Sequence, residues 1–208
     1  MWYEDFMYCK TCYDLKQKGN FCPLCLQCYQ DSDFTTKMVQ CGRCEFWIHA
    51  ACEDMSDDQY EVLSDLPEEA VVFHCRQCRE RRERGKRVEG GERELTWRDA
   101  VNRSMREAFS KVLEAIHPPV HTSLFSDLNN LRREMDRREW SSVSSFAEEV
   151  KESIERCVQT HKPQSPEAEA AHSMGSTVTK ELIRCFPWYA LECGETWRKE
   201  REVRVVRR

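Results

Sequence analysis

The sequence predicts a small cysteine-rich α+β module followed by an all-α four-helix bundle. Two observations carry the prediction. Ten of the 13 cysteines lie within residues 9–78, mostly as pairs with two residues between them. From Trp97 onward, apolar residues recur at steps of three and four, which is the pattern of an amphipathic helix with one buried face.

Cysteine pairs of this kind suit either disulfides or metal ions. The chain shows no hydrophobic signal segment before the cysteines and no apolar run near the ~20 residues that a membrane span requires. Paired thiols in a reducing compartment then point to zinc.

Charge divides along the chain. Residues 1–78 carry 6 Lys and Arg against 14 Asp and Glu, a net charge of −8. Residues 79–208 carry 26 Lys and Arg against 23 Asp and Glu, a net charge of +3. The acidic part disfavours nucleic acid and suits a basic partner, although plain solubility explains the charge equally well.

Eight residues have the spacing of zinc ligands. They form four pairs, each with two intervening residues, and the gaps between successive pairs are 15, 4 and 22 residues. In chain order this is four cysteines, one histidine and three cysteines, enough for two closed tetrahedral sites. Two ions, rather than an apolar core, would then hold about 60 residues together. The pairs are Cys22 with Cys25, Cys41 with Cys44, His49 with Cys52, and Cys75 with Cys78.

This ligand order, with Trp47 two positions before His49, resembles a PHD finger. A RING domain shares the cross-brace, but usually has its histidine in fourth place and lacks this tryptophan, which makes it the weaker interpretation. Because the pairs interleave in a PHD finger, the resemblance implies one zinc on Cys22, Cys25, His49 and Cys52 and another on Cys41, Cys44, Cys75 and Cys78.

The resemblance can be narrowed. The stretch KGNFCPLCLQCYQDSDFTTKMVQCGRCEFWIHAACEDMSDDQYEVLSDLPE is similar to the third PHD finger of the trithorax/mixed-lineage-leukaemia histone H3 lysine 4 methyltransferases, which a bromodomain follows. This implies a nuclear chromatin module. No stretch resembles the catalytic SET domain, so we expect the chain itself to be no enzyme. The expected domains are 1–20, the remnant of a preceding zinc finger; 21–79, the PHD finger; 80–95, a charged linker; 96–192, a degenerate bromodomain-like bundle; and 193–208, a basic tail.

Three cysteines of the first part remain. Cys28 offers Cys25 with Cys28 as an alternative first pair, although Cys22 with Cys25 places Tyr29 four residues past the pair, as in related fingers. Cys9 and Cys12 resemble the end of the preceding finger. Either Cys9, Cys12 and Cys28 share a third zinc, or Cys9 and Cys12 are a stub whose partners are missing.

The family resemblance also implies a methyl-lysine cage. A quaternary ammonium has no N–H to donate, so such sites surround it with aromatic faces. The cage positions correspond to Tyr29, Phe34, Met38 and Trp47, with phenylalanine at a position where tyrosine is more common. The alternative is that these side chains form the small core of the finger.

The expected ligand is the tail of histone H3 trimethylated at lysine 4. In the usual mode an extended peptide adds as a strand to a sheet edge. The backbone of Lys37, Val39 and Gln40 is expected to pair with it.

Four amphipathic helices are expected in the second part. Their connections include His117-Pro118-Pro119 and a loop over 161–171, and Ser141 and Ser142 are expected caps. Short connections between such helices make a bundle. The apolar series run from Trp97 to Ile116, through Leu128, Leu131 and Met135, from Val143 to Cys157, and from Met174 to Phe186.

Residues 127–157 resemble the second and third helices of a bromodomain. Bromodomains hold the acetyl carbonyl with an asparagine just past the third helix, but here that position is His161 and no asparagine follows residue 130. We therefore expect a scaffold or a surface for a protein partner rather than an acetyl-lysine site, with His161 exposed in a loop.

A module that binds the trimethylated H3 tail is the leading hypothesis, with no membrane and no nucleic acid as partner. A RING-like zinc-dependent ubiquitin ligase and a purely structural interaction module are the alternatives.

Overall fold

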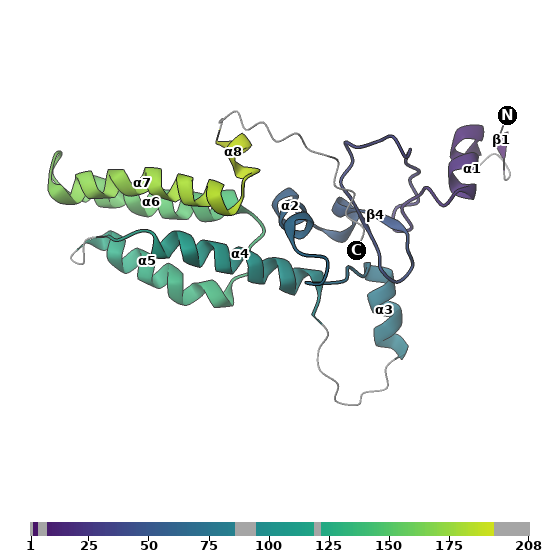
Figure 1. Ribbon diagram of the computed structural model, residues 1–208, viewed down its shortest axis with the longest axis horizontal. Coiled ribbons are helices and arrows are strands. Elements are labelled where there is room, and N and C mark those ends of the chain that lie inside the picture. The colour runs from purple at the N-terminus through teal and green to yellow at the C-terminus, as the bar shows by residue number, and fades with distance from the viewer. Residues whose placement is uncertain (1, 4–7, 86–94, 119–121, 194–208) are drawn as a thin grey trace. The chain divides into compact units, whose positions relative to one another are not determined.

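The computed structural model describes residues 2–3, 8–85, 95–118 and 122–193 (Figure 1). These residues fall into two compact units, one extending to Ala100 and one beginning at Val101. The expected linker is outside the described residues at 86–94, and so is the basic tail from residue 194. None of the described helices is long and apolar enough to cross a membrane.

The first unit contains two short hairpins and three α-helices. The first hairpin pairs β1 (Trp2–Tyr3) with β2 (Tyr8–Cys9), and the second pairs β3 (Met38–Gln40) with β4 (Trp47–His49), both antiparallel. A 3-10 turn, η1 (Ala50–Glu53), follows β4 directly. The helices are α1 (Lys10–Gln17), α2 (Asp57–Asp65) and α3 (Arg76–Gly85).

Local sequence signals explain where these helices lie. The α2 helix begins at a capping box, in which the Ser56 side chain accepts from the Gln59 amide and the Gln59 side chain accepts from the Ser56 amide. The α3 helix continues through the first residues of the expected linker, so part of the 80–95 segment is helical. A segment this rich in charged residues can form either an extended linker or a solvent-exposed helix, and the described part of it is helical.

Few large side chains are buried in the first unit. Val39 and Ile48 point to one face of the β3–β4 hairpin and are 1% and 0% exposed, and Leu63 and Phe73 are fully buried. The Phe73 ring lies 6.5 Å from the ring of Trp97, at the start of the next helix. A core of this size is typical of units in which bound metal ions supply part of the folding free energy.

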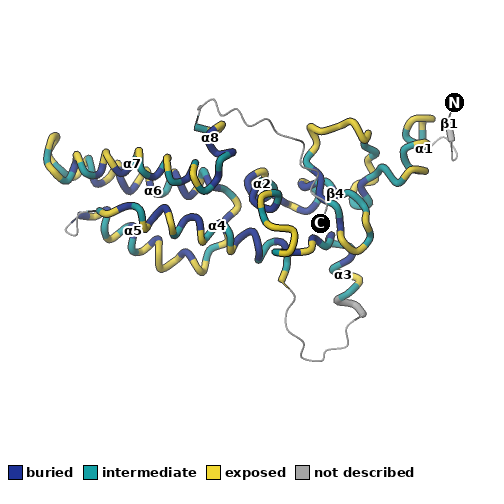
Figure 2. The backbone as a smooth tube through the Cα atoms, in the orientation of Figure 1, coloured by how far each residue is buried: buried dark blue, intermediate teal, exposed yellow. Residues whose placement is uncertain are grey.

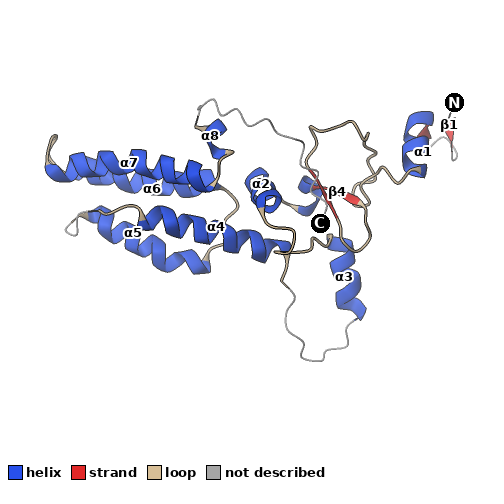
Figure 3. Ribbon diagram, in the orientation of Figure 1, coloured by secondary structure: helices blue, strands red, loops and turns tan. Residues whose placement is uncertain are grey.

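The second unit is a helical bundle, in which α6 and α7 run side by side (Figures 1 and 3). A prediction corrected here is the loop over 161–171, because helix α7 already begins at Pro166. Ser165 caps it, and proline suits the first helical position. The helices are α4 (Trp97–Glu114), whose first four residues belong to the first unit, α5 (Ser123–Glu134), η2 (Met135–Arg137), α6 (Val143–Thr160), α7 (Pro166–Cys185) and α8 (Tyr189–Glu192).

Aromatic rings form the centre of the bundle. Phe109 of α4 stacks on Phe146 of α6 with ring centroids 4.0 Å apart, and Trp140 meets both rings edge-on. Phe186, just after α7, lies 5.9 Å from Phe109. The inward faces of the helices are accordingly buried along their length (Figure 2). The apolar periodicity of the sequence therefore correctly predicted which helix faces pack together.

Candidate metal centres and ligand site

The first metal centre joins a loop to the end of a hairpin. Its donors are the sulfurs of Cys22, Cys25 and Cys52 and a ring nitrogen of His49, and all four lie within 4.8 Å of one another. His49 ends β4 and Cys52 lies in η1. The His49 Nδ1 atom is 3.3 Å from the Cys25 sulfur and 3.7 Å from the Cys52 sulfur.

The second metal centre joins the turn of the β3–β4 hairpin to helix α3. Its four donors, all within 4.8 Å of one another, are the sulfurs of Cys41, Cys44, Cys75 and Cys78. The Cys44 and Cys75 sulfurs are 4.0 Å apart, and the Cys75 amide donates to the Cys41 sulfur over 3.3 Å.

Both donor sets fit zinc. Two zinc–sulfur bonds of about 2.3 Å at the tetrahedral angle place their sulfurs about 3.8 Å apart, and the separations above scatter around that value. Thiolates with one imidazole are the donors of closed structural zinc sites. The chain thus forms two four-ligand zinc sites, and their pairs interleave along the sequence in a cross-brace.

Each zinc site begins with a C-x2-C turn, and the two turns have the same backbone geometry. In each turn the residue after the second cysteine has a left-handed backbone conformation, Leu26 with φ 63° and Glu45 with φ 62°. The Leu26 amide donates to the Cys22 carbonyl and the Glu45 amide to the Cys41 carbonyl, both over 2.8 Å. This equivalence identifies Cys22 with Cys25 as the first ligand pair and leaves Cys28 outside it.

The backbone of these turns favours a thiolate at the first position of each. Burial acts to raise the pKa of Cys22, but amides of His49, Cys25 and Leu24 outweigh it and lower the pKa. The same balance lowers the pKa of Cys41, where the amides belong to Cys75, Cys44 and Arg43.

Three further cysteine ligands, Cys44, Cys52 and Cys75, depend on the metal for their charge state. Burial, first among several causes, raises the pKa of Cys44 to about 11 and that of Cys52 to about 12. Burial also raises the pKa of Cys75. A bound cation reverses this preference and ionises the thiols. Burial lowers the pKa of His49, which keeps the imidazole neutral and able to bind a metal.

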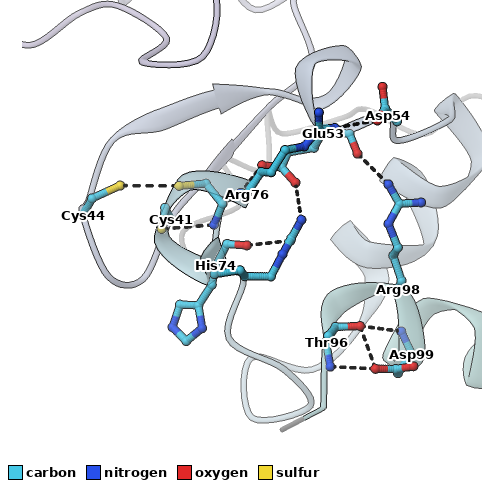
Figure 4. Close-up of polar contacts among 11 residues, drawn as sticks. Cys41, Cys44, Glu53, Asp54, His74, Arg76, Thr96, Arg98 and Asp99 are labelled. Carbon is cyan, nitrogen blue, oxygen red and sulfur yellow. Dashed lines mark hydrogen bonds and ion pairs between the residues drawn. The ribbon is translucent and has the colours of Figure 1, made fainter. Parts of the chain in front are cut away.

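A buried carboxylate braces the second zinc site, and sequence reasoning did not find it. Glu53, at the end of η1, is 1% exposed. Its carboxylate accepts from the Arg76 amide at the start of α3 and from the Arg79 guanidinium at 3.0 Å. Its carbonyl accepts from the Arg98 guanidinium over 2.8 Å (Figure 4). The only sequence feature that could have suggested this role is that Glu53 directly follows the zinc ligand Cys52.

Two of the four residues predicted for the methyl-lysine cage lie on the hairpin face that carries the zinc ligand His49. Paired residues of an antiparallel hairpin share a face, and the register pairs Met38 with His49 and Gln40 with Trp47. Trp47 and Met38 therefore lie on the same face as the ligand His49. Trp47 is half-buried, and Met38 is 9% exposed.

The two other predicted cage residues precede β3. Burial raises the pKa of Tyr29, and the negative charges of Asp31 and Cys22 raise it further. Phe34 is 63% exposed, so its ring is accessible to a ligand.

The pairing register changes which backbone groups can accept a peptide strand. The Ala50 amide donates to the Lys37 carbonyl and the Cys41 amide to the Phe46 carbonyl. With Val39 opposite Ile48, this pattern directs the amide and carbonyl of Val39 toward β4 and those of Met38 and Gln40 outward. Of the three residues predicted to pair with a peptide, only Gln40 has outward backbone groups. Lys37 and Val39 pair within the hairpin, and Met38 is the other residue of β3 whose backbone groups point outward.

The outer edge of β3 faces helix α2. Burial raises the pKa of Tyr60 of α2, and the Lys37 ammonium lies 5.5 Å from the centroid of its ring. The Lys37 ammonium lies 3.0 Å from an Asp57 oxygen and 3.4 Å from a Glu61 oxygen. Acidic side chains of α2 therefore flank the strand.

The three leftover cysteines lie apart from both zinc sites. Cys9 precedes α1, Cys12 is in its first turn, and Cys28 follows the first ligand pair. The Cys28 thiol is 3.6 Å from the Cys12 carbonyl oxygen. Cys28 thus faces α1 rather than the metal.

His161 has a more specific place than an exposed loop. It lies at the C-terminal end of α6, where its Nδ1 is 2.7 Å from the Cys157 carbonyl oxygen. A ring N–H that donates there satisfies one of the last carbonyls of the helix. In the described part of the bundle, the buried amide of Asn102 is similarly engaged, because its oxygen accepts from the Trp140 amide over 2.8 Å.

The fold and the two centres define the class of this chain: a cross-brace zinc finger of the PHD kind followed by a helical domain. Comparisons with known proteins agree. The chain is 43% identical to the histone-lysine N-methyltransferase trithorax of Drosophila melanogaster over 108 residues, 52% of this chain and 3% of the relative. It is 36% identical to trithorax of Drosophila virilis over 145 residues, 69% and 3%.

The human histone-lysine N-methyltransferase 2B is 29% identical over 215 residues, which cover 95% of this chain and 7% of that protein. No family model matches the chain. The chain spans only a few per cent of the length of these relatives, as a non-catalytic region of such a protein would. It belongs to the trithorax/mixed-lineage-leukaemia family of histone-lysine methyltransferases.

Proposed function

We propose that the chain is a chromatin module of the nucleus whose finger binds the tail of histone H3 trimethylated at lysine 4. The observation that carries the proposal is the face that Met38 and Trp47 share with the zinc ligand His49, which the register of the β3–β4 hairpin sets. The two other predicted cage residues, Tyr29 and Phe34, come from the segment between the first ligand pair and β3, and Phe34 is 63% exposed. The relatives are histone-lysine methyltransferases by name, which supports a histone as partner.

The charges around this face suit a quaternary ammonium. Ring faces attract such a cation, by about 2 kcal/mol where it is desolvated. The nearest carboxylate on the loop, Asp33, already accepts from the hydroxyls of Thr35 at 2.7 Å and Thr36 at 2.8 Å. Its capacity to accept an N–H from a less methylated lysine is therefore reduced. This favours trimethyl-lysine over monomethyl-lysine.

The edge of β3 provides the register for the peptide. The outward amide and carbonyl groups of Met38 and Gln40 can each pair with an extended chain, and Met38 also belongs to the cage. The acidic Asp57 and Glu61 lie beside this strand and suit a basic tail.

The bundle has a supporting role in this proposal. His161 caps α6 and Asn102 holds the Trp140 backbone, so the polar groups that could replace the missing bromodomain asparagine are engaged. The bundle serves as a scaffold or as a surface for a protein partner.

The test is a calorimetric titration of the zinc-loaded chain with H3 tail peptides, unmodified and trimethylated at lysine 4. We expect the trimethylated peptide to bind at least about tenfold more tightly, because a single cation–π contact of about 2 kcal/mol already accounts for about 30-fold. Trp47→Ala should abolish the difference while both zinc ions stay bound. Leu191→Ala, which removes an exposed apolar side chain in the second unit, is the control and should change nothing. Equal affinities for the two peptides would refute the proposal.

A further inference from the structure

The two zinc sites leave one cysteine cluster unexplained: Cys9, Cys12 and Cys28, which we call the α1 cluster. All three are at least partly accessible, Cys9 exposed and the other two half-buried. Cysteine is among the residues most often fully buried in proteins, so three accessible thiols gathered at one place require a chemical reason.

Backbone geometry brings these cysteines together from two segments. Cys9 and Cys12 occupy the cap and the first turn of α1, so they form a C-x2-C pair across a helix start. Cys28 is held by an isolated bridge to Phe21 and turns its sulfur to within 3.6 Å of the Cys12 carbonyl. The same bridge anchors Phe21, and the Lys16 ammonium of α1 lies 5.6 Å from its ring. Helix α1 is therefore already docked against the segment that carries Cys28.

Cys12 is the central thiol of the cluster. Cys9 lies three residues before it across the start of α1, and the Cys28 sulfur lies 3.6 Å from its carbonyl oxygen. The three sulfurs are not all within the 4.8 Å that both finger sites satisfy. Rotation of an exposed cysteine between staggered χ1 wells moves its sulfur by about 3 Å, which is enough to bring Cys9 into a common site.

We propose that the α1 cluster is a third metal site, in which Cys9, Cys12 and Cys28 bind one zinc ion with water as the fourth ligand. Binding releases three thiol protons to solvent and leaves a site with a net charge of −1. The N-terminus of α1 favours that charge, and the amide of Cys12 already lowers the pKa of Cys9. The ion would fasten α1 to the finger.

An open site of three thiolates differs measurably from the two closed ones. A ligand position held by water exchanges readily, so this zinc should be lost first to a chelator. The three protein ligands come from segments that need no ion to be close, so its loss should leave the finger folded.

The experiment measures zinc per chain, by metal analysis and native mass spectrometry under reducing conditions, on the whole chain. We expect three ions in the unaltered chain and two in Cys28→Ser and in the double variant Cys9→Ser/Cys12→Ser. Cys193→Ser, a half-buried cysteine of the second unit, should retain three. Cobalt substitution gives a second readout. The thiolate-to-cobalt absorption of the two cluster variants should be lower by the contribution of one site with three thiolates, and that of Cys193→Ser should be unchanged.

Two zinc ions in the unaltered chain, or three in Cys28→Ser, would overturn the proposal. It is also overturned if Cys28→Ser falls below two ions or loses the fold of the finger, since Cys28 would then be a ligand of the finger. These readouts do not involve the histone peptide, so they are independent of the proposed function.

Discussion

Replacing the buried Glu53 should weaken the second zinc site although Glu53 is not a ligand. Its carboxylate accepts from the Arg76 amide, one residue after the ligand Cys75, and from Arg79, one residue after the ligand Cys78. Without that carboxylate, the first turn of α3 loses the acceptor that fixes two ligands in place (Figure 4).

The size of the effect follows from these contacts. A hydrogen bond to a charged group contributes about 1.5–3 kcal/mol. The Arg76 bond should count in full, because its acceptor is 1% exposed, whereas the Arg79 side chain is 27% exposed and can turn to solvent. We expect Glu53→Ala to cost about 3 kcal/mol in all. Glu53→Gln keeps one oxygen for the Arg76 amide and should cost about 1–2 kcal/mol.

Zinc competition with a chromophoric chelator measures this loss, since metal binding and folding of such a unit are linked. A cost of about 3 kcal/mol corresponds to roughly 100-fold weaker binding at the second site. The matched control is Asp54→Asn, the neighbouring acid, which is 73% exposed and pairs with the Arg76 side chain at the surface. It should change zinc affinity by less than about fivefold. If Glu53→Ala binds zinc within threefold of the unaltered chain, the bracing role assigned to Glu53 is wrong.

Three further outcomes are expected. A strong chelator should unfold the first unit while most of the helical circular dichroism remains, because the described bundle contains neither four-donor set; complete loss of the signal would contradict this. Phe109→Ala should lower the free energy of unfolding of the bundle by about 3–5 kcal/mol in urea melts, and a loss below 1 kcal/mol would exclude a central packing role. Burial, followed by the charge of Cys193, raises the pKa of Tyr189 to about 12. Because the unfolded phenol ionises near 10, bundle stability should fall from about pH 10 to 12, and Tyr189→Phe should remove that part of the fall.

The sequence by itself determined the two zinc sites and the helical character of the second part. Ligand spacing is a local property of the chain, and the C-x2-C turns around Cys22 and Cys41 fold alike whatever surrounds them. Helical periodicity is also local, so the series through Phe109 and Phe146 found the faces that pack. Ser142 was one of two expected caps, and the structure places the helix start directly after it.

Only the tertiary structure decided the features that depend on register and on contacts between distant residues. Pairing of Val39 with Ile48 turns the outward backbone groups to Met38 and Gln40, and a shift of one residue would have reversed them. Glu53 is separated from Arg76 by 22 residues, so nothing local predicts that its carboxylate is buried there. The first ligand pair was ambiguous for the same reason. Cys25 has a cysteine three residues away on each side, and the turn geometry and the position of α1, rather than the spacing, direct Cys22 to the zinc and Cys28 away from it.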